Sequence, residues 1–175
     1  EDKARDFKRF QRNHSLDKAV KPKDYDREDK ANKVAVITIY AGRNLVAKDK
    51  TMFGKHEKSD PYVKVYFGSQ KVGKTPIMYE TLNPVWGKGT EGHEMTCSLG
   101  KLNTRLTKRF LEVSIWDHDY GTANDPMGVV DLKFPKEYNS QVVSWYKVEK
   151  GKKGHRTYCH NASGELKIGL EVKLS

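Results

Sequence analysis

The last strand-like segment before the C-terminus constrains the fold more than any other part of the chain. From residue 166 to residue 174, apolar side chains occupy every second position, and charged residues or glycine occupy the positions between them. A period of two places successive side chains on opposite faces of a β-strand. A strand with one apolar and one polar face is typical of an antiparallel sheet that covers a core on one side.

Short runs of β-branched and aromatic residues recur from Val34 onward, separated by glycine, proline, asparagine and aspartate. This spacing is typical of an antiparallel β-sandwich. We expect eight strands, near residues 34–41, 62–67, 72–77, 93–99, 110–116, 128–134, 145–148 and 165–174. The predicted fold class is therefore all-β, an eight-stranded antiparallel β-sandwich over residues 34–175.

Residues 1–33 differ from the rest in their charge, with 11 basic and 8 acidic side chains and few apolar ones. We interpret them as a charged N-terminal extension or linker, in which residues 4–12 have the spacing of a short helix. Packing of this segment on the domain and a free linker remain two open alternatives. Because the chain begins with Glu1 rather than Met, we expect it to be a fragment of a longer protein.

The overall composition narrows the class of partner. Lys and Arg number 33 against 23 Asp and Glu, a formal net charge of +10, which favours anionic partners such as phospholipid headgroups. The sequence has no apolar run of transmembrane length and no signal-peptide pattern. The two cysteines, Cys97 and Cys159, match no metal-binding spacing, so we expect reduced thiols in a reducing compartment.

Five aspartates contrast with this basic background. A sandwich would gather the connections that carry them at one end, so their negative charges would lie close together. They are Asp49, Asp60, Asp117, Asp119 and Asp125. Two like charges about 5 Å apart repel by roughly 3 kcal/mol at an effective dielectric near 20, so the cluster indicates a bound cation. Calcium fits best, since it takes about six to eight oxygen ligands in irregular loops. Any single aspartate could instead cap a turn, but the set together favours a metal site.

The segment after residue 116 has further features of such a site. Residues two apart in an extended chain point the same way, so Asp117 and Asp119 converge while His118 turns aside. The His118 backbone carbonyl is then available as an oxygen ligand. Gly121 allows the chain to fold back toward the cluster, and Thr122 can add a hydroxyl ligand.

Three further motifs accompany the aspartates, namely Ser-Asp-Pro-Tyr-Val-Lys-Val from residue 59, Thr-Leu-Asn-Pro-Val-Trp from residue 81 and Asp-Pro-Met-Gly from residue 125. Together with the aspartates they resemble the C2 domain, the calcium- and lipid-binding β-sandwich of protein kinase C, synaptotagmins, phospholipases and ferlins. The resemblance covers residues 34–175 and implies type II topology. It also implies that the five aspartates bind two or three calcium ions, together with Thr122 and the backbone carbonyls of Lys50 and His118.

The resemblance further implies a phosphoinositide site on the concave face of the sandwich. The matching residues are Tyr62, Lys64, Lys74, Trp116 and Asn124, with Lys71 nearby. Two departures from the family pattern stand out: Asp49 and Asp60 lie eleven positions apart, so the first loop is long, and Pro76 stands where a lysine is expected. Burial of Tyr62 and Trp116, with the lysines as a solvated face, is the alternative interpretation.

The predicted function is calcium-dependent binding to anionic membranes containing phosphatidylserine or phosphoinositides. Two calcium ions would change the summed charge of five aspartates from about −5 to about −1, an electrostatic switch. Met52 and Phe53 on the long loop, with Tyr120 opposite, would then enter the headgroup region, unless Met52 and Phe53 fold back onto the sandwich.

Other functions are less consistent with the sequence. No serine, cysteine or second histidine completes a nucleophilic set around Asp117 and Asp119, so we expect no enzyme. No zinc, recognition-helix or aromatic ribonucleoprotein motif indicates nucleic-acid binding. We therefore expect a monomeric cytoplasmic module of a larger signalling or trafficking protein, recruited peripherally to membranes when calcium rises. A calcium-independent C2 domain that binds phosphoinositides or proteins is the alternative.

Overall fold

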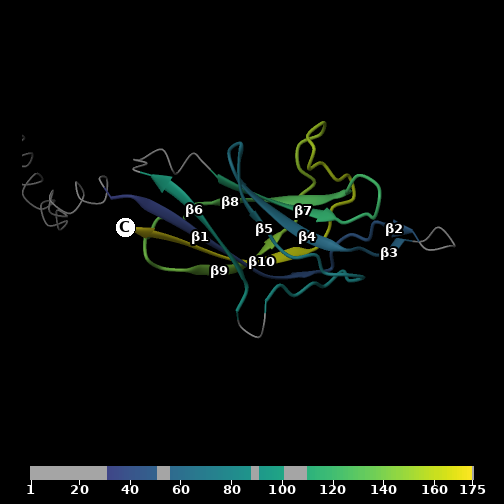
Figure 1. Cartoon of the computed structure of the whole chain (residues 1–175), viewed down its shortest axis with the longest axis horizontal. Helices are drawn as coiled ribbons and strands as arrows, with labels where there is room; N and C mark the ends of the chain where they lie inside the picture. The colour runs from purple at the N-terminus through teal and green to yellow at the C-terminus, as the bar shows by residue number, and fades with distance from the viewer. Residues whose placement is uncertain (1–30, 51–55, 88–90, 101–109, 175) are drawn as a thin grey trace, which may run out of the picture. The chain divides into compact units, whose positions relative to one another are not determined.

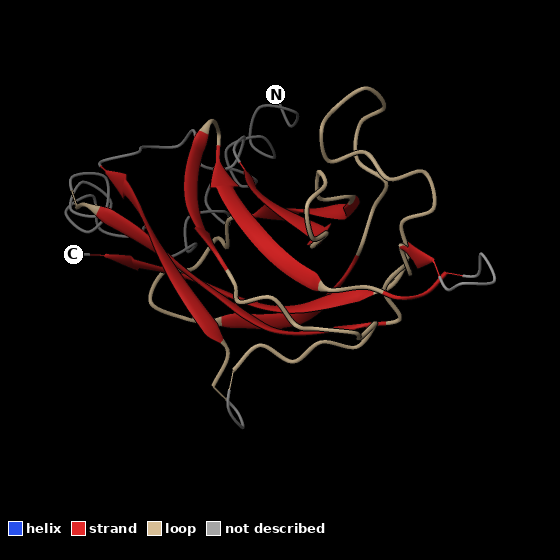
Figure 2. Cartoon of the chain, turned by 45° about the vertical axis from the view of Figure 1, so that its right-hand side comes forward, coloured by secondary structure: helices blue, strands red, loops and turns tan. Residues whose placement is uncertain are grey.

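The computed structural model describes residues 31–50, 56–87, 91–100 and 110–174. The chain divides into two units, Glu1–Ala31 and Asn32–Ser175, and all the described strands lie in the second. They form two four-stranded sheets and one two-stranded sheet, with no helix in the described ranges (Figures 1 and 2). The prediction of an all-β sandwich is confirmed. The helical spacing at residues 4–12 falls outside the described residues.

The first large sheet has the strand order β6-β1-β10-β9. Its members are β1 (Lys33–Arg43), β6 (His93–Gly100), β9 (Val142–Lys147) and β10 (Glu165–Leu174). The first and last strands pair antiparallel from Lys33↔Leu174 to Arg43↔Glu165. The alternation at the C-terminus acts as expected, because the apolar residues of β10 from Leu166 to Val172 are buried at that spacing.

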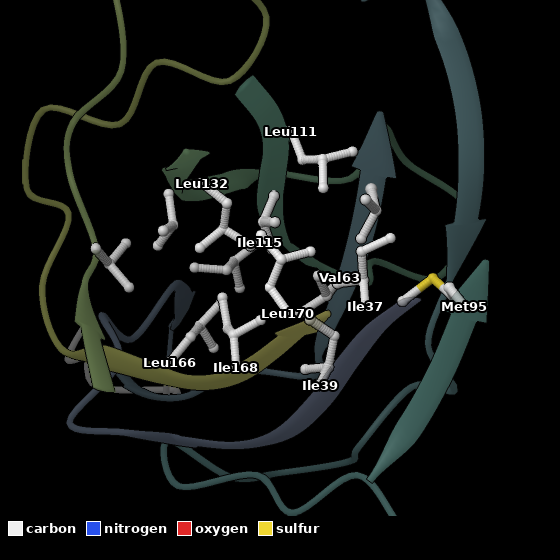
Figure 3. Close-up of a cluster of buried hydrophobic side chains, with 14 of the residues drawn as sticks. Ile37, Ile39, Val63, Met95, Leu111, Ile115, Leu132, Leu166, Ile168 and Leu170 are labelled. Carbon is white, nitrogen blue, oxygen red and sulfur yellow. The ribbon is translucent and has the colours of Figure 1, made fainter. Parts of the chain in front are cut away.

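The second large sheet has the order β5-β4-β7-β8. Its members are β4 (Pro61–Phe67), β5 (Gln70–Lys74), β7 (Phe110–Asp117) and β8 (Pro126–Lys133). Side chains from both sheets meet in one core, where Ile37, Val63, Ile115 and Leu170 lie together (Figure 3). Full burial of each such side chain contributes about 1.5–3 kcal/mol, which holds the two sheets face to face.

Strand β5 ends earlier than the predicted segment of residues 72–77. The backbone N–H of Val63 donates to Thr75 Oγ1 at 2.9 Å, and the N–H of Thr75 donates to the Val63 carbonyl, also at 2.9 Å. The hydroxyl thus replaces a main-chain acceptor at the end of the ladder. Pro76 follows and has no N–H with which to continue it. A side-chain hydrogen bond and a proline therefore end the strand at Lys74.

The long connection that precedes β4 contains the two-stranded sheet of β2 (Asp49–Lys50) and β3 (His56–Lys58). This sheet lies at the same end of the sandwich as the connection between β7 and β8 (Figure 1). The Ser59 Oγ accepts the N–H of Lys48 at 2.9 Å, which ties the start of the connection to its end. The two cysteines, Cys97 and Cys159, are free thiols and both are buried.

Candidate functional site

Three chain segments that carry predicted calcium ligands meet at one end of the second sheet. Asp60 directly precedes β4, Asp117 ends β7, and the register places Pro61 opposite Asp117. The backbone N–H of Asp60 donates to Asp117 Oδ1 at 2.5 Å, and the N–H of His118 donates to the Asp60 carbonyl at 3.1 Å. The pairing of β4 with β7 therefore brings two aspartates together that lie far apart in the sequence.

The connection between β7 and β8 returns the remaining aspartates to this end. The N–H of Asp117 donates to the Asp125 carbonyl at 2.8 Å. Asn124 links the connection to β4, because its Oδ1 accepts the N–H of Asp119 at 3.1 Å and its Nδ2 donates to Tyr62 Oη at 2.7 Å. This side chain therefore braces the loop that carries Asp119 and Asp125.

The aspartates differ in their exposure. Asp117 is fully buried, Asp60 and Asp119 are half-buried, and Asp125 is exposed. Asp60 Oδ1 accepts the N–H of Glu80 at 2.7 Å. Within the described part of the chain, Asp60, Asp119 and Asp125 form no ion pair with a lysine or arginine. These three carboxylates offer hard oxygen ligands with no counter-ion among the residues that the structure describes, and such ligands fit calcium.

The side chains are nevertheless not arranged as a completed metal site. Among the described residues, no three His, Cys, Asp or Glu side chains form a group that could hold a metal ion. Asp49 enters the structure through its backbone, which pairs with Lys58, and the side chains of Asp49 and Lys50 lie outside the description, as do Met52 and Phe53. The calcium ligand set therefore stays a prediction.

The His118 ring lies between two tyrosine rings. Its ring makes edge contacts with the Tyr62 ring, 6.5 Å between centroids, and with the Tyr120 ring, 5.8 Å. Tyr120 is 94% exposed at the tip of the connection, and Thr122 is exposed beside it. An aromatic column thus runs from the sheet to the loop tip.

The predicted lipid-binding residues lie on the outer face of the second sheet, except Asn124, which lies in the connection between β7 and β8. Tyr62 stands opposite Trp116 in the β4–β7 register, and Lys64 stands opposite Lys74 in the β4–β5 register. The Lys64 ammonium lies 4.1 Å from the centroid of the Trp116 ring and 5.2 Å from that of Tyr62. Both rings are buried, as the alternative interpretation expected, yet they form a floor beneath a cation.

The lysines on this face have no carboxylate partner among the described residues. Lys64 and Lys74 form no ion pair there, although their side chains project on the same side of directly opposite positions. Lys71 is exposed near the far end of the strand pair, where Tyr66 is its partner. Two neighbouring lysines without a carboxylate partner among the described residues, one of them over aromatic rings, suit an anionic group.

One residue on this face was missed by the sequence analysis. The Arg156 guanidinium lies 4.2 Å from the centroid of the Tyr66 ring and 3.6 Å from Glu112 Oε1. Arg156 belongs to the long connection between β9 and β10, which the sequence pattern left without an element. Its basic run from Lys150 to Arg156 was the only signal that could have drawn attention to it.

Comparisons with known proteins agree with this architecture. Human "Multiple C2 and transmembrane domain-containing protein 1" is 33% identical over 92 residues, which are 53% of this chain and 8% of that protein. A C2 and GRAM domain-containing protein of Arabidopsis thaliana is 32% identical over 127 residues, covering 70% of this chain and 11% of its own length. This chain therefore spans only a small part of the curated relatives that it matches.

Solved structures share the fold. A C2 domain of plant Extended Synaptotagmin 1 has a TM-score of 0.62 at 21% identity, over 83% of this chain and 97% of that one. A calcium-bound structure of the two C2 domains of Extended-Synaptotagmin 2 has a TM-score of 0.62 at 20% identity, over 81% of this chain and 46% of that one. The family model of the C2 domain matches residues 33–148. The chain belongs to the C2 domain family.

Proposed function

We propose that this chain attaches to anionic phospholipid membranes in a calcium-dependent manner. The observation that carries the proposal is the convergence of Asp60, Asp117 and Asp125 through the Asp60–Asp117 and Asp117–Asp125 hydrogen bonds. Membership of the C2 family supports a membrane-binding module. Within the described ranges, no helix has the length and apolarity needed to cross a bilayer, so the attachment we propose is peripheral.

The proposed calcium ligands are those that the family pattern implies. They are Asp49, Asp60, Asp117, Asp119 and Asp125, with the Thr122 hydroxyl and the backbone carbonyls of Lys50 and His118. Two or three bound calcium ions would supply positive charge and open positions for lipid oxygens. The chain itself orients the carboxylates: the Asp117 carboxylate is held by the Asp60 N–H, and Asn124 holds the Asp119 backbone.

The aromatic column supplies the proposed apolar contact with the membrane. Tyr120 presents an almost fully exposed ring at the tip, supported by the His118 ring behind it. Tyrosine suits the boundary between headgroups and acyl chains, because its ring is apolar and its hydroxyl is polar. Met52 and Phe53 are proposed to enter the same region from the first loop.

The outer face supports a second proposed contact, with a phosphoinositide headgroup. Lys64 and Lys74 project side by side, and Lys64 rests on the Tyr62 and Trp116 rings. This face does not require calcium, so it also supports the alternative function of a calcium-independent lipid- or protein-binding C2 domain. Calorimetry with calcium and no lipid separates the two, because the alternative predicts neither heat nor a shift in melting temperature.

Sedimentation with vesicles containing phosphatidylserine tests the calcium proposal. The parent chain should sediment with calcium and stay in solution with a chelator, and Asp117→Asn with Asp119→Asn should not sediment in either condition. Asparagine keeps an oxygen for the Asp60 N–H, so the fold should survive. Glu94→Gln, an exposed change on β6, is the matched control. Sedimentation of the double variant at the parent's level would contradict the proposal.

Vesicles with and without a phosphoinositide test the outer face. We expect Lys64→Ala with Lys74→Ala to lose the preference for phosphoinositide while calcium uptake is unchanged. Lys133→Ala with Lys136→Ala, two exposed lysines away from this face's aromatic floor, should keep the preference. An unchanged preference in the first variant would remove this face from the proposed function.

The proposed activity is binding rather than catalysis. A solved structure of human GIVD cytosolic phospholipase A2 also matches, with a TM-score of 0.60 at 19% identity, but the match covers only 17% of that chain. We propose that this chain likewise serves as one module of a larger signalling or trafficking protein. It would act as a monomer on the cytoplasmic side of membranes when calcium rises.

A further inference from the structure

A pocket lies beside β8, and none of the five predicted calcium-binding aspartates is among its lining residues. It has a volume of 540 Å³ and is walled by the start of the β9–β10 connection, with Val129, Val130, Tyr146, Lys147, Lys150 and Lys152 among its lining. This volume falls in the range of about 300–1,000 Å³ typical of small-molecule sites. Figure 1 shows the connection, coloured yellow-green, on the side of β7 and β8.

The wall of this pocket is held in place by backbone hydrogen bonds. Val129 and Glu149 exchange two of them, at 3.0 and 2.8 Å. The Lys150 carbonyl accepts the N–H of Cys159 at 2.8 Å, and Cys159 is itself buried in the core. Gly151 adopts a φ of 73°, a left-handed conformation that turns the chain between the two wall lysines. The pocket is therefore preformed.

Arg156 anchors the far part of the same connection. Tyr66 and Glu112 are opposite each other in the β4–β7 register, and the guanidinium contacts both the ring and the carboxylate. A planar guanidinium suits this combination of ring stacking and carboxylate pairing. The connection therefore contacts the sheet at both ends of its basic run, through Glu149 on Val129 and through Arg156 on Tyr66.

Two lysines in the wall of the pocket have no acidic partner among the described residues and can bind an anion. Lys147 pairs with Glu149 at 3.7 Å, whereas Lys150 and Lys152 form no ion pair or side-chain hydrogen bond with the described residues. The other acidic residue of the lining, Asp131, pairs with neither lysine. The apolar part of the lining comes from Val129, whose side chain lies on the face of β8 opposite to the core residue Val130, and from Tyr146.

We propose that this pocket binds a small amphipathic anion. Its phosphate or carboxylate lies against Lys150 and Lys152, and its short apolar chain lies on Val129 and the Tyr146 ring. Ammonium groups bind such anions through charge-assisted hydrogen bonds. The site includes neither the five aspartates nor the Lys64 face. A failed test of this pocket would therefore leave the proposed calcium function unaffected, and the reverse also holds.

Calorimetry with octyl phosphate, without calcium or vesicles, tests the site. We expect saturable binding to one site, with inorganic phosphate and octyltrimethylammonium each weaker by about tenfold or more, since each lacks one of the two matching groups. Lys150→Gln with Lys152→Gln should weaken octyl phosphate by about tenfold or more. Lys133→Gln with Lys136→Gln, exposed lysines that do not line the pocket, should leave its affinity unchanged.

The source of the anion is resolved by competition. Vesicles of phosphatidic acid without calcium that displace octyl phosphate would assign the site to a lipid headgroup, and vesicles that leave its affinity unchanged would assign it to a soluble molecule. Three outcomes would each overturn the proposal. They are an absence of saturable binding, an affinity for octyltrimethylammonium or inorganic phosphate equal to that for octyl phosphate, and an unchanged affinity in a Lys150→Gln, Lys152→Gln variant that keeps the parent's melting temperature.

Discussion

Asn124 offers the sharpest test of how the fold positions the candidate site. Its side chain accepts the Asp119 N–H and donates to the Tyr62 hydroxyl, so Asn124→Ala removes two hydrogen bonds at once. A hydrogen bond contributes a net 0.5–1.5 kcal/mol to stability, so we expect a loss of about 1–3 kcal/mol in the free energy of unfolding. Tyr62→Phe removes only the second bond and should cost about 1 kcal/mol.

Because the two residues share a bond, their effects should not add. Urea unfolding without calcium should show that Asn124→Ala with Tyr62→Phe costs less than the sum of the single changes, by about 1 kcal/mol. Tyr79→Phe, a change to a tyrosine that is 63% exposed, is the control and should change nothing. If the two changes add to within about 0.5 kcal/mol, the Asn124–Tyr62 hydrogen bond does not stabilise the fold as we propose. Under the proposed function, Asn124→Ala should also weaken calcium uptake, since Asp119 loses its support.

Three further outcomes follow from packing and charge. Ile115 is fully buried, so Ile115→Ala should lower the free energy of unfolding by about 2–5 kcal/mol in urea, and a loss no larger than that of a surface change would contradict its place in the core. Asp131 is exposed as a residue, but partial burial of its carboxyl raises the pKa above 3.8, so the stability that its protonated form contributes is lost as pH rises through the raised pKa. Asp131→Asn should therefore be more stable than the parent at neutral pH, with the gain vanishing below about pH 4, and a melting temperature no higher than the parent's at neutral pH would argue against this. Arg156→Ala should cost about 1 kcal/mol through its ring stack and its half-exposed pair with Glu112, whereas Lys153→Ala, which is exposed in the same connection, should leave the melting temperature unchanged.

The sandwich could be predicted from local patterns because strand periodicity is a local property. The alternation along β10 indicated its buried face, and residues 165–174 form the predicted strand. The motif around Asp60 and the aspartates after Trp116 indicated the family, and the family model confirms it. The end of β5 was predicted too late, because the Thr75 hydroxyl takes over a main-chain acceptor before Pro76, a substitution that periodicity does not detect.

The sequence by itself determined which residues face the core, which ones carry charge, and which motifs place the chain in its family. Only the tertiary structure decided that Asn124 joins Tyr62, that Lys64 rests on Trp116, and that Arg156 reaches Tyr66. These contacts join segments up to about ninety positions apart, and they depend on which strands are neighbours and in what register. The periodicity of each strand determines which face its side chains occupy. The pairing of strands determines which side chains come into contact, and that pairing depends on burial across the whole core.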